Sequence, residues 1–194
     1  MRSEDKFKRT VCGVGYIGDG VYKVRENYEW SPIYTRWRQI IQRCYNENTK
    51  KTLSNYDGCY VHQDWHNFQN FAEWFEQQYK EDGWQVDKDI LVVGNREYGP
   101  YTCAMVPSII NTAVSKNRGR VLPQGVSTKG RRFAARVSSP NGRVHLGTYD
   151  TPGEAFEVYK EAKEAYIQGL AEKYKGRIRE DVYEALMNFE VYPF

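Results

Sequence analysis

Two segments in the second half of the chain alternate between apolar and polar residues. Phe, Ala and Val occupy every second position of residues 132–138, and the pattern returns over residues 143–149. A period of two places alternate side chains on opposite faces of a β-strand. Asn141-Gly142 between them is typical of a tight hairpin turn. With a third strand expected near residues 125–129, these segments predict a three-stranded sheet. Its expected buried side chains are Val126, Phe133, Ala135, Val137, Val144 and Leu146.

Apolar residues at spacings of three and four predict helices in both halves of the chain. Ser31-Pro32 suits the first turn of one helix, and Thr151 suits the N-cap of a long one. Because the long helix directly follows the predicted sheet, it is the expected cover for the apolar sheet face. Further helices are expected at about residues 65–79, from Pro107, and at about 179–189. A strand is expected over 84–91, and glycine-rich residues 1–30 are expected to be loop.

The polar segment 115–124 contains Gly and Pro and is the predicted linker. It separates an N-terminal region, residues 1–114, from a sheet-and-helix region, residues 125–175. Residues 176–194 then form a helical tail. Strands and helices that occur in separate groups favour an α+β fold.

Composition narrows the class of protein. Of the 194 residues, 40% are hydrophobic and 15% aromatic, enough for a packed core. No apolar run reaches the roughly 18 residues that a membrane span requires, and no signal peptide is visible, so a soluble cytoplasmic protein is expected. The four cysteines (Cys12, Cys44, Cys59 and Cys103) form no CxxC pair and are expected to be free thiols. A zinc site built from all four is the alternative.

Charge is concentrated in one segment. Residues 116–149 carry eight Lys or Arg and no Asp or Glu, although the whole chain has a formal net charge of only +3. A sheet with one apolar and one cationic face suits the phosphates of a nucleic-acid duplex. The alternative is that the basic residues are simply solvated and that the cationic sheet binds no ligand. The basic residues are Lys116, Arg118, Arg120, Lys129, Arg131, Arg132, Arg136 and Arg143.

Short motifs in this region also follow a known order. They are Gly125-Val126, the strand Phe133–Val137, the turn Leu146–Thr151, and the helix start Glu154-Ala155 with Tyr159. Residues 123 to about 170 thereby resemble the AP2 DNA-binding domain, best known from plant ethylene-response factors. The resemblance implies a three-stranded antiparallel sheet packed on a helix, with the sheet in the major groove of double-stranded DNA.

Carried over position by position, the resemblance assigns DNA contacts to outward-facing basic residues. Ser127 stands where the family often has Arg, which bears on base specificity more than on affinity for DNA. Arg can pair bidentately with guanine, whereas Lys mainly contacts phosphate. The assigned residues are Lys129, Arg131, Arg132, Arg136, Arg143 and, as a weaker candidate, His145.

A second series of motifs runs through residues 13–113 and resembles phage HNH-type homing endonucleases, many of which also carry an AP2 domain. The resemblance implies an HNH-like (ββα-metal related) region with helices at residues 1–114. The motifs are Tyr34–Trp37, Arg43–Tyr45, Tyr56–Cys59, Asp64-Trp65, Phe68–Trp74, Asp87–Ile90, Gly94-Asn95, Tyr98, Cys103, Val106-Pro107 and Asn111.

HNH chemistry uses a divalent metal, Mg²⁺ or Mn²⁺, and a general base that is nearly always His. The resemblance implies that Asp87 and Asn111 hold the metal and that Asn95 is the middle Asn of the motif. Lys88 stands where the His is expected. A lysine acts as a base only after losing its proton, and the flanking carboxylates of Asp87 and Asp89 oppose that loss.

Each of these residues also has a structural interpretation. Asp87, Lys88 and Asp89 could form a solvated turn, Asn95 the left-handed residue of a turn, and Asn111 a cap. His62 and His66 are interpreted as surface residues rather than ligands.

Three functions therefore remain open. The first is a DNA-binding protein of the HNH–AP2 lineage with weakened or lost catalysis. The second is an active metal-dependent nicking or homing endonuclease. The third is a protein-interaction module, such as an anti-defence factor, whose basic sheet binds an acidic partner. A phage origin, implied only by the resemblance, would place the protein in the bacterial host cytoplasm. No membrane partner or small-molecule substrate is expected, and the patterns specify neither target sequence nor oligomeric state.

Overall fold

The computed structural model describes residues 3–52, 56–78, 81–115, 121–139 and 142–194. The chain divides into two compact units, residues 1–82 with 86–105, and residues 83–85 with 106–194. The division at 105/106 precedes the predicted linker, whose residues 116–120 lie outside the described part. The structure combines helices with several small sheets, compatible with the predicted α+β class.

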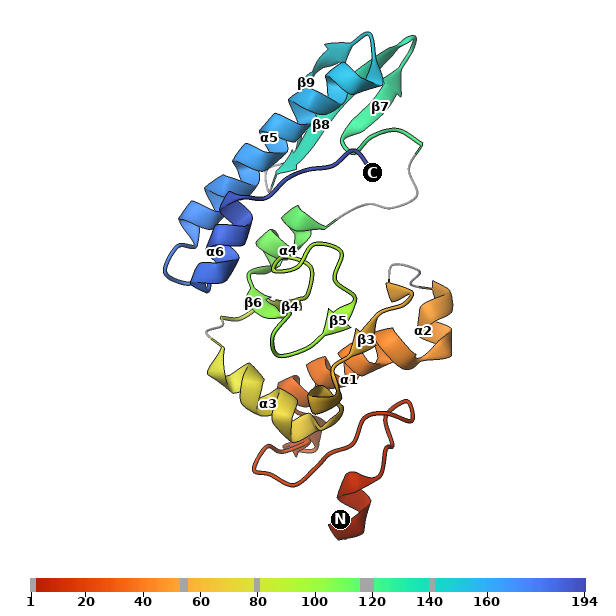
Figure 1. Ribbon diagram of the computed structural model, residues 1–194, viewed down its shortest axis with the longest axis vertical. Helices are drawn as coiled ribbons and strands as arrows, with labels where there is room; N and C mark the ends of the chain where they lie inside the picture. The colour runs from red at the N-terminus through yellow and green to blue at the C-terminus, as the bar shows by residue number, and fades with distance from the viewer. Residues whose placement is uncertain (1–2, 53–55, 79–80, 116–120, 140–141) are drawn as a thin grey trace. The chain divides into compact units, whose positions relative to one another are not determined.

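The first unit combines helices with three very small sheets (Figure 1). Strands β1 and β2 pair antiparallel, β3 and β5 pair parallel, and β4 pairs with β6. Its elements are η1 (Ser3–Phe7), β1 (Arg25–Glu26), β2 (Glu29–Trp30), α1 (Pro32–Tyr45), α2 (Glu47–Thr52), β3 (Tyr60–Val61), η3 (Gln63–His66), α3 (Phe68–Gln77), β4 (Gln85–Asp87), β5 (Glu97–Tyr98) and β6 (Ala104–Val106). The end residues Gln85 of β4 and Val106 of β6 are assigned to the second unit.

An aromatic core joins α1 to α3. The predicted start of α1 is confirmed, because the Ser31 hydroxyl accepts a hydrogen bond from the Tyr34 N–H at 3.2 Å. Trp37 and Phe68 are fully buried, and their ring centroids lie 5.6 Å apart. The indole N–H of Trp37 donates to the Trp65 carbonyl oxygen at 2.6 Å. The predicted aromatic stripe of α3 is therefore core, as expected.

Three predicted elements of this unit were partly wrong. The helix expected over 65–79 begins only at Phe68, because the Asn67 side chain caps it by accepting the Gln69 N–H at 3.0 Å. The strand expected over 84–91 ends at Asp87, where the carboxylate turns the chain by binding two following amides. Residues 1–30 were predicted to be loop because of their glycines, but residues 25–30 form the antiparallel pair β1–β2.

The second unit is a sheet-and-helix layer with additional helices. Strands β7 (Val126–Lys129), β8 (Arg132–Ser139) and β9 (Gly142–Tyr149) form an antiparallel sheet in the order β7-β8-β9. The long helix α5 (Pro152–Lys173) lies along one face of it (Figure 1). The other helices are α4 (Ser108–Val114) and α6 (Glu180–Met187). Of the predicted hairpin turn, Asn141 lies outside the described residues and Gly142 begins β9.

Helix α5 begins where the sequence predicts. The Thr151 hydroxyl accepts the Glu154 N–H at 3.2 Å, and the Glu154 carboxylate accepts the Thr151 N–H at 3.3 Å. This capping box satisfies two N–H groups that the first helical turn leaves without intrahelical partners.

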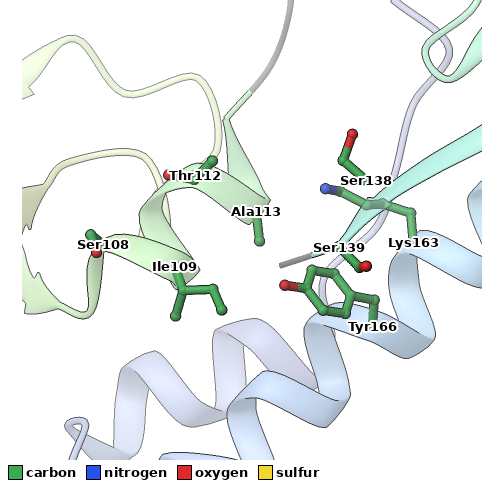
Figure 2. Close-up of a pocket in the computed structure, with 8 residues that line it drawn as sticks. All are labelled: Ser108, Ile109, Thr112, Ala113, Ser138, Ser139, Lys163 and Tyr166. Atoms are coloured by element: carbon green, nitrogen blue, oxygen red, sulfur yellow. The ribbon is translucent and has the colours of Figure 1, made fainter. Parts of the chain in front are cut away.

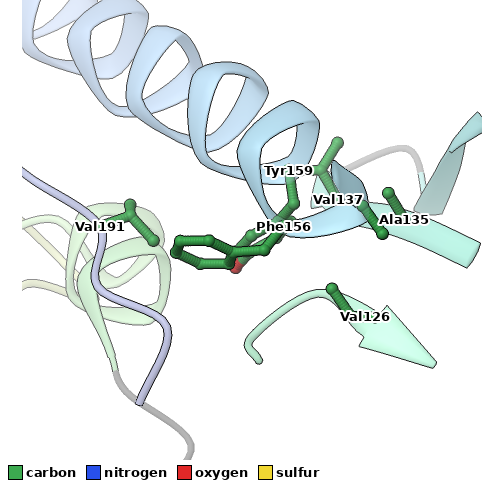
Figure 3. Packing of buried hydrophobic residues seen from close by; sticks show 7 residues of the cluster. Val126, Ala135, Val137, Phe156, Tyr159 and Val191 are labelled. Atoms are coloured by element: carbon green, nitrogen blue, oxygen red, sulfur yellow. The ribbon is translucent and has the colours of Figure 1, made fainter. Parts of the chain in front are cut away.

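The core of the second unit lies between α5 and the sheet (Figure 3). Phe156 and Tyr159 from the helix pack on the apolar strand positions, and Val191 from the C-terminal segment joins them. Gly125 has a φ of +72°, and a Cβ there would lie 2.0 Å from the Tyr159 ring. The glycine is required because the ring occupies the space of a side chain. The cluster is Val126, Ala135, Val137, Ala155, Phe156, Tyr159 and Val191.

A β-bulge interrupts strand β9. Ala135 pairs with Gly147 whereas the next residue, Arg136, pairs with His145, so Leu146 is an extra residue. Gly147 accommodates the bend with a φ of +146°. The prediction that Val144 is buried was wrong, since 49% of it is exposed. It lies on an edge strand two residues from the strand's start, where few side chains are available to cover it.

Candidate nucleic-acid interface

The strand register places the predicted cationic side chains on the sheet face opposite α5. Residues that pair directly across antiparallel strands project to the same face. Lys129 pairs with Arg132, Arg136 with His145, and Arg143 with Ser138. Since their neighbours Ala135 and Val137 are buried against the helix, these pairs point away from it. We call this side of the sheet the outward face; its five basic residues are Lys129, Arg132, Arg136, Arg143 and His145, all exposed.

Small side chains form the centre of the outward face. Ala134 pairs with Ser127 on one side and with Thr148 on the other. Ala134 is nevertheless completely buried, because the larger side chains around it cover its single methyl group. The outward face therefore has a centre of short side chains with the longer cationic side chains around it.

The sixth predicted residue, Arg131, lies in the two-residue turn between β7 and β8. It is exposed, and the preceding Gly130 has a φ of +63°, as turns of this length require. Arg131 therefore extends the cationic surface beyond the end of the two strands.

The outward face has one acidic neighbour that the sequence analysis missed. Arg132 Nε lies 2.7 Å from Asp150 Oδ1, and both side chains are largely exposed. Asp150 directly follows the acid-free segment, so its position beside the predicted cations was visible in the sequence. At the weaker candidate His145, Nε2 lies 3.4 Å from the Thr148 hydroxyl.

The predicted HNH residues of the first unit form a hydrogen-bonded turn. Asp87 is 8% exposed, and its Oδ1 accepts the N–H groups of Asp89 and Ile90, each at 2.8 Å. Burial raises the pKa of Asp87 from its ordinary value, although these two hydrogen bonds oppose the shift. The carboxylate thus holds the backbone that follows it.

Lys88 and Asn95 complete this turn. Lys88 is 5% exposed, and its ammonium donates to Asp89 Oδ1 at 2.6 Å and to the Asn95 carbonyl at 2.8 Å. The Asn95 amide donates to the Lys88 and Glu97 carbonyls, and its oxygen accepts the Glu97 N–H at 2.9 Å. Each polar atom of the two side chains therefore has a partner within the turn. We call residues 87–98 the Asp87–Asn95 clamp.

Asn111, the other predicted metal ligand, belongs to α4 in the second unit, whereas Asp87 belongs to the first. The Asn111 amide donates to Gln85 Oε1 at 2.5 Å. Within the described residues, no three His, Cys, Asp or Glu side chains are grouped as a metal site would require. All four cysteines are thiols rather than disulfides, and burial raises the pKa of Cys44 and of Cys103 to about 12.

The two histidines near Trp65 are half-buried rather than fully exposed. His62 Nδ1 accepts the Asp64 N–H at 3.3 Å, and His66 Nε2 lies 3.1 Å from the Val61 carbonyl oxygen. Burial lowers the pKa of His66. Both rings stabilise the local backbone.

No protein-family model, curated protein or solved structure matches the chain significantly. Among the described residues, no helix combines the length and apolar character needed to cross a membrane.

Proposed function

We propose that this chain binds double-stranded DNA through the outward face of sheet β7–β8–β9. The observation that carries the proposal is the register, which gathers five exposed basic residues on one face while the other face packs on α5. Cationic side chains on a two- or three-stranded ribbon can contact phosphates and base edges in the major groove. The AP2-like motifs noted in the sequence support the same mode of binding.

We further propose that the HNH-like half binds no catalytic metal and does not cut DNA. If it were active, Asp87 and Asn111 would hold Mg²⁺ or Mn²⁺ and Lys88 would have to accept a proton. The clamp argues against this chemistry, because Lys88 donates to both Asp89 and the Asn95 carbonyl. Those contacts stabilise the charged ammonium, which cannot act as a base.

DNA binding is tested by fluorescence anisotropy with a labelled duplex at several salt concentrations. Arg136→Glu is compared with Lys51→Glu, which makes the same charge change at an exposed position of α2. We expect Arg136→Glu to weaken binding at least about tenfold, with a salt slope lower by about one for each lost phosphate contact. We expect Lys51→Glu to change affinity much less. Equal weakening in the two variants would mean that DNA responds only to the net charge of the protein and that the sheet is not the binding surface.

If the wild-type protein fails to bind any duplex, the sheet is not a DNA reader and an acidic protein partner becomes the better hypothesis. Cleavage is tested separately on supercoiled DNA with Mg²⁺ and with Mn²⁺. Asp87→Asn serves as control, because it removes the carboxylate charge but keeps an acceptor for the two amides. We expect the DNA to be bound and uncut. Nicking by the wild type that Asp87→Asn abolishes would establish a working nuclease instead.

A further inference from the structure

The second unit contains a cavity of about 280 Å³ that the DNA-binding face does not include. It lies between α4, the last residues of β8 and the middle of α5, and Figure 2 shows the Lys163 amine and Tyr166 ring directed from α5 toward α4. Five residues that carry hydroxyl groups line it: Ser108, Thr112, Ser138, Ser139 and Tyr166. Its volume is just below the range for small-ligand pockets, about 300–1,000 Å³, so it suits a small group.

Lys163 supplies the only charge among the residues that line the cavity. It is half-buried, and no described carboxylate forms an ion pair with it. The centroid of the Tyr166 ring lies 5.8 Å from Nζ. Burial lowers the pKa of the Lys163 amine. One turn earlier on α5, Lys160 instead lies 4.0 Å from a Glu164 carboxylate oxygen. A partly desolvated ammonium without a counter-ion is unfavourable, and a bound anion would relieve that cost.

The lining also indicates the kind of anion. Residues with hydroxyl groups from α4, β8 and α5 line the same cavity as the Lys163 amine. Ser, Thr and Lys are common ligands of phosphate oxygens. Tyr166 and Ile109 contribute an apolar wall against which a sugar ring can pack. Ser138 pairs with Arg143 in the sheet register, so it borders both the cavity and the outward face.

We propose that this cavity binds the phosphate of one nucleotide unit, with Lys163 and the surrounding hydroxyls as its ligands. The phosphate can come from the backbone of DNA bound on the outward face or from a free nucleotide. The first source rests on the proposed DNA binding, whereas the second does not. In both cases the negative charge lies beside Lys163 and the sugar beside Tyr166.

The test compares Lys163→Gln with Lys160→Gln, which removes the same charge from the same helix outside the cavity. Thermal unfolding first establishes that both variants are folded. Duplex affinity is then measured against salt concentration. Separately, amide NMR spectra are recorded with thymidine monophosphate, inorganic phosphate and uncharged thymidine.

A backbone phosphate in the cavity would make Lys163→Gln weaken DNA binding about three- to tenfold, with a salt slope lower by about one, and leave Lys160→Gln near wild type. A free nucleotide would instead shift the Thr112 and Ser138 amides with thymidine monophosphate but not thymidine, and Lys163→Gln would abolish the shifts. The inference is overturned if neither readout distinguishes Lys163→Gln from Lys160→Gln. If the wild type binds no duplex but shows the nucleotide shifts, the proposed function fails and the phosphate site stands.

Discussion

Arg132 Nε and Asp150 Oδ1 lie 2.7 Å apart at the edge of the outward face. Asp150 is thus an intramolecular competitor for one of the cations that we assign to DNA. An exposed ion pair contributes only about 0–1 kcal/mol, so a phosphate can displace it. The carboxylate nevertheless repels the DNA backbone whenever the duplex approaches this edge.

We therefore expect Asp150→Asn to increase affinity for duplex DNA. The gain should be about two- to fivefold at low salt and should diminish as salt screens the charges. Anisotropy titrations at two salt concentrations measure it, with Asp181→Asn as a control at an acid paired with Arg179 instead. An unchanged or weaker affinity for Asp150→Asn would mean that the Arg132 side of the sheet does not face DNA.

Asp87 gives a prediction about stability and pH. Because burial raises the folded-state pKa of Asp87 above its ordinary value of 3.8, the folded protein binds this proton more tightly than the unfolded chain. The free energy of unfolding is therefore expected to fall as pH rises from the unfolded-state pKa of Asp87, about 3.8, through its higher folded-state pKa. Asp87→Asn, which cannot ionise, should be at least as stable as the wild type at pH 7. That advantage should shrink as pH falls through this window.

Asp87→Ala separates the charge from the hydrogen bonds. It leaves the part-buried N–H of Asp89 and the buried N–H of Ile90 without their acceptor, at a cost of about 1–3 kcal/mol. Urea unfolding of the three proteins at pH 7 and at pH 4 measures both effects. A stability of Asp87→Ala equal to that of Asp87→Asn would show that the clamp does not hold the backbone.

Gly125 and Tyr159 give a prediction about the sheet–helix core. We expect Gly125→Ala to lower the free energy of unfolding by about 1–3 kcal/mol, because its Cβ would overlap the Tyr159 ring and its φ is positive. Gly130→Ala is the matched control, since φ there is also positive but no atom lies within 4 Å of the added Cβ. The difference between the two variants in urea unfolding isolates the clash. Equal losses would attribute the whole effect to backbone strain.

The C-terminal segment should stabilise the second unit. Val191 is 5% exposed in the core cluster, and its N–H donates to Glu164 Oε1 at 2.8 Å. Gln124 also binds the Tyr192 and Pro193 carbonyl oxygens, each at 3.0 Å. Val191→Ala should therefore cost about 1–3 kcal/mol. Val121→Ala, at a position that is 94% exposed, should change unfolding by less than about 0.5 kcal/mol.

The parts of the fold that the sequence predicts are those determined by neighbouring residues. The capping groups at Ser31 and Thr151 and the alternation along β8 are local signals, and the structure confirms the elements that they predict. Local signals did not predict where the strand expected over residues 84–91 ends. That end depends on where the Asp87 carboxylate points, and neither its bonds nor its burial appears in the apolar pattern.

The candidate sites differ in the same respect. The cationic pattern of β8 and β9 was visible from charge and periodicity alone. The hydrogen bonds between Lys88 and Asn95 were not, because each side chain donates to the other residue's backbone carbonyl, which the turn itself brings close. Lys163 was not among the predicted site residues. Whether a described carboxylate lies beside it depends on how α4, β8 and α5 pack, which the apolar pattern does not show.

The extra residue Leu146 changes which positions of β9 face solvent: odd-numbered residues before it and even-numbered residues after it. Before it, Arg143 and His145 occupy the solvent side at odd positions; after it, Tyr149, also odd, packs on the helix and Thr148 faces solvent. In an uninterrupted strand, Arg143, His145 and Tyr149 would all project to the same face of the sheet. The insertion uncouples them, so the charges that begin β9 can be exchanged, in evolution or by design, without disturbing the aromatic contact that ends it.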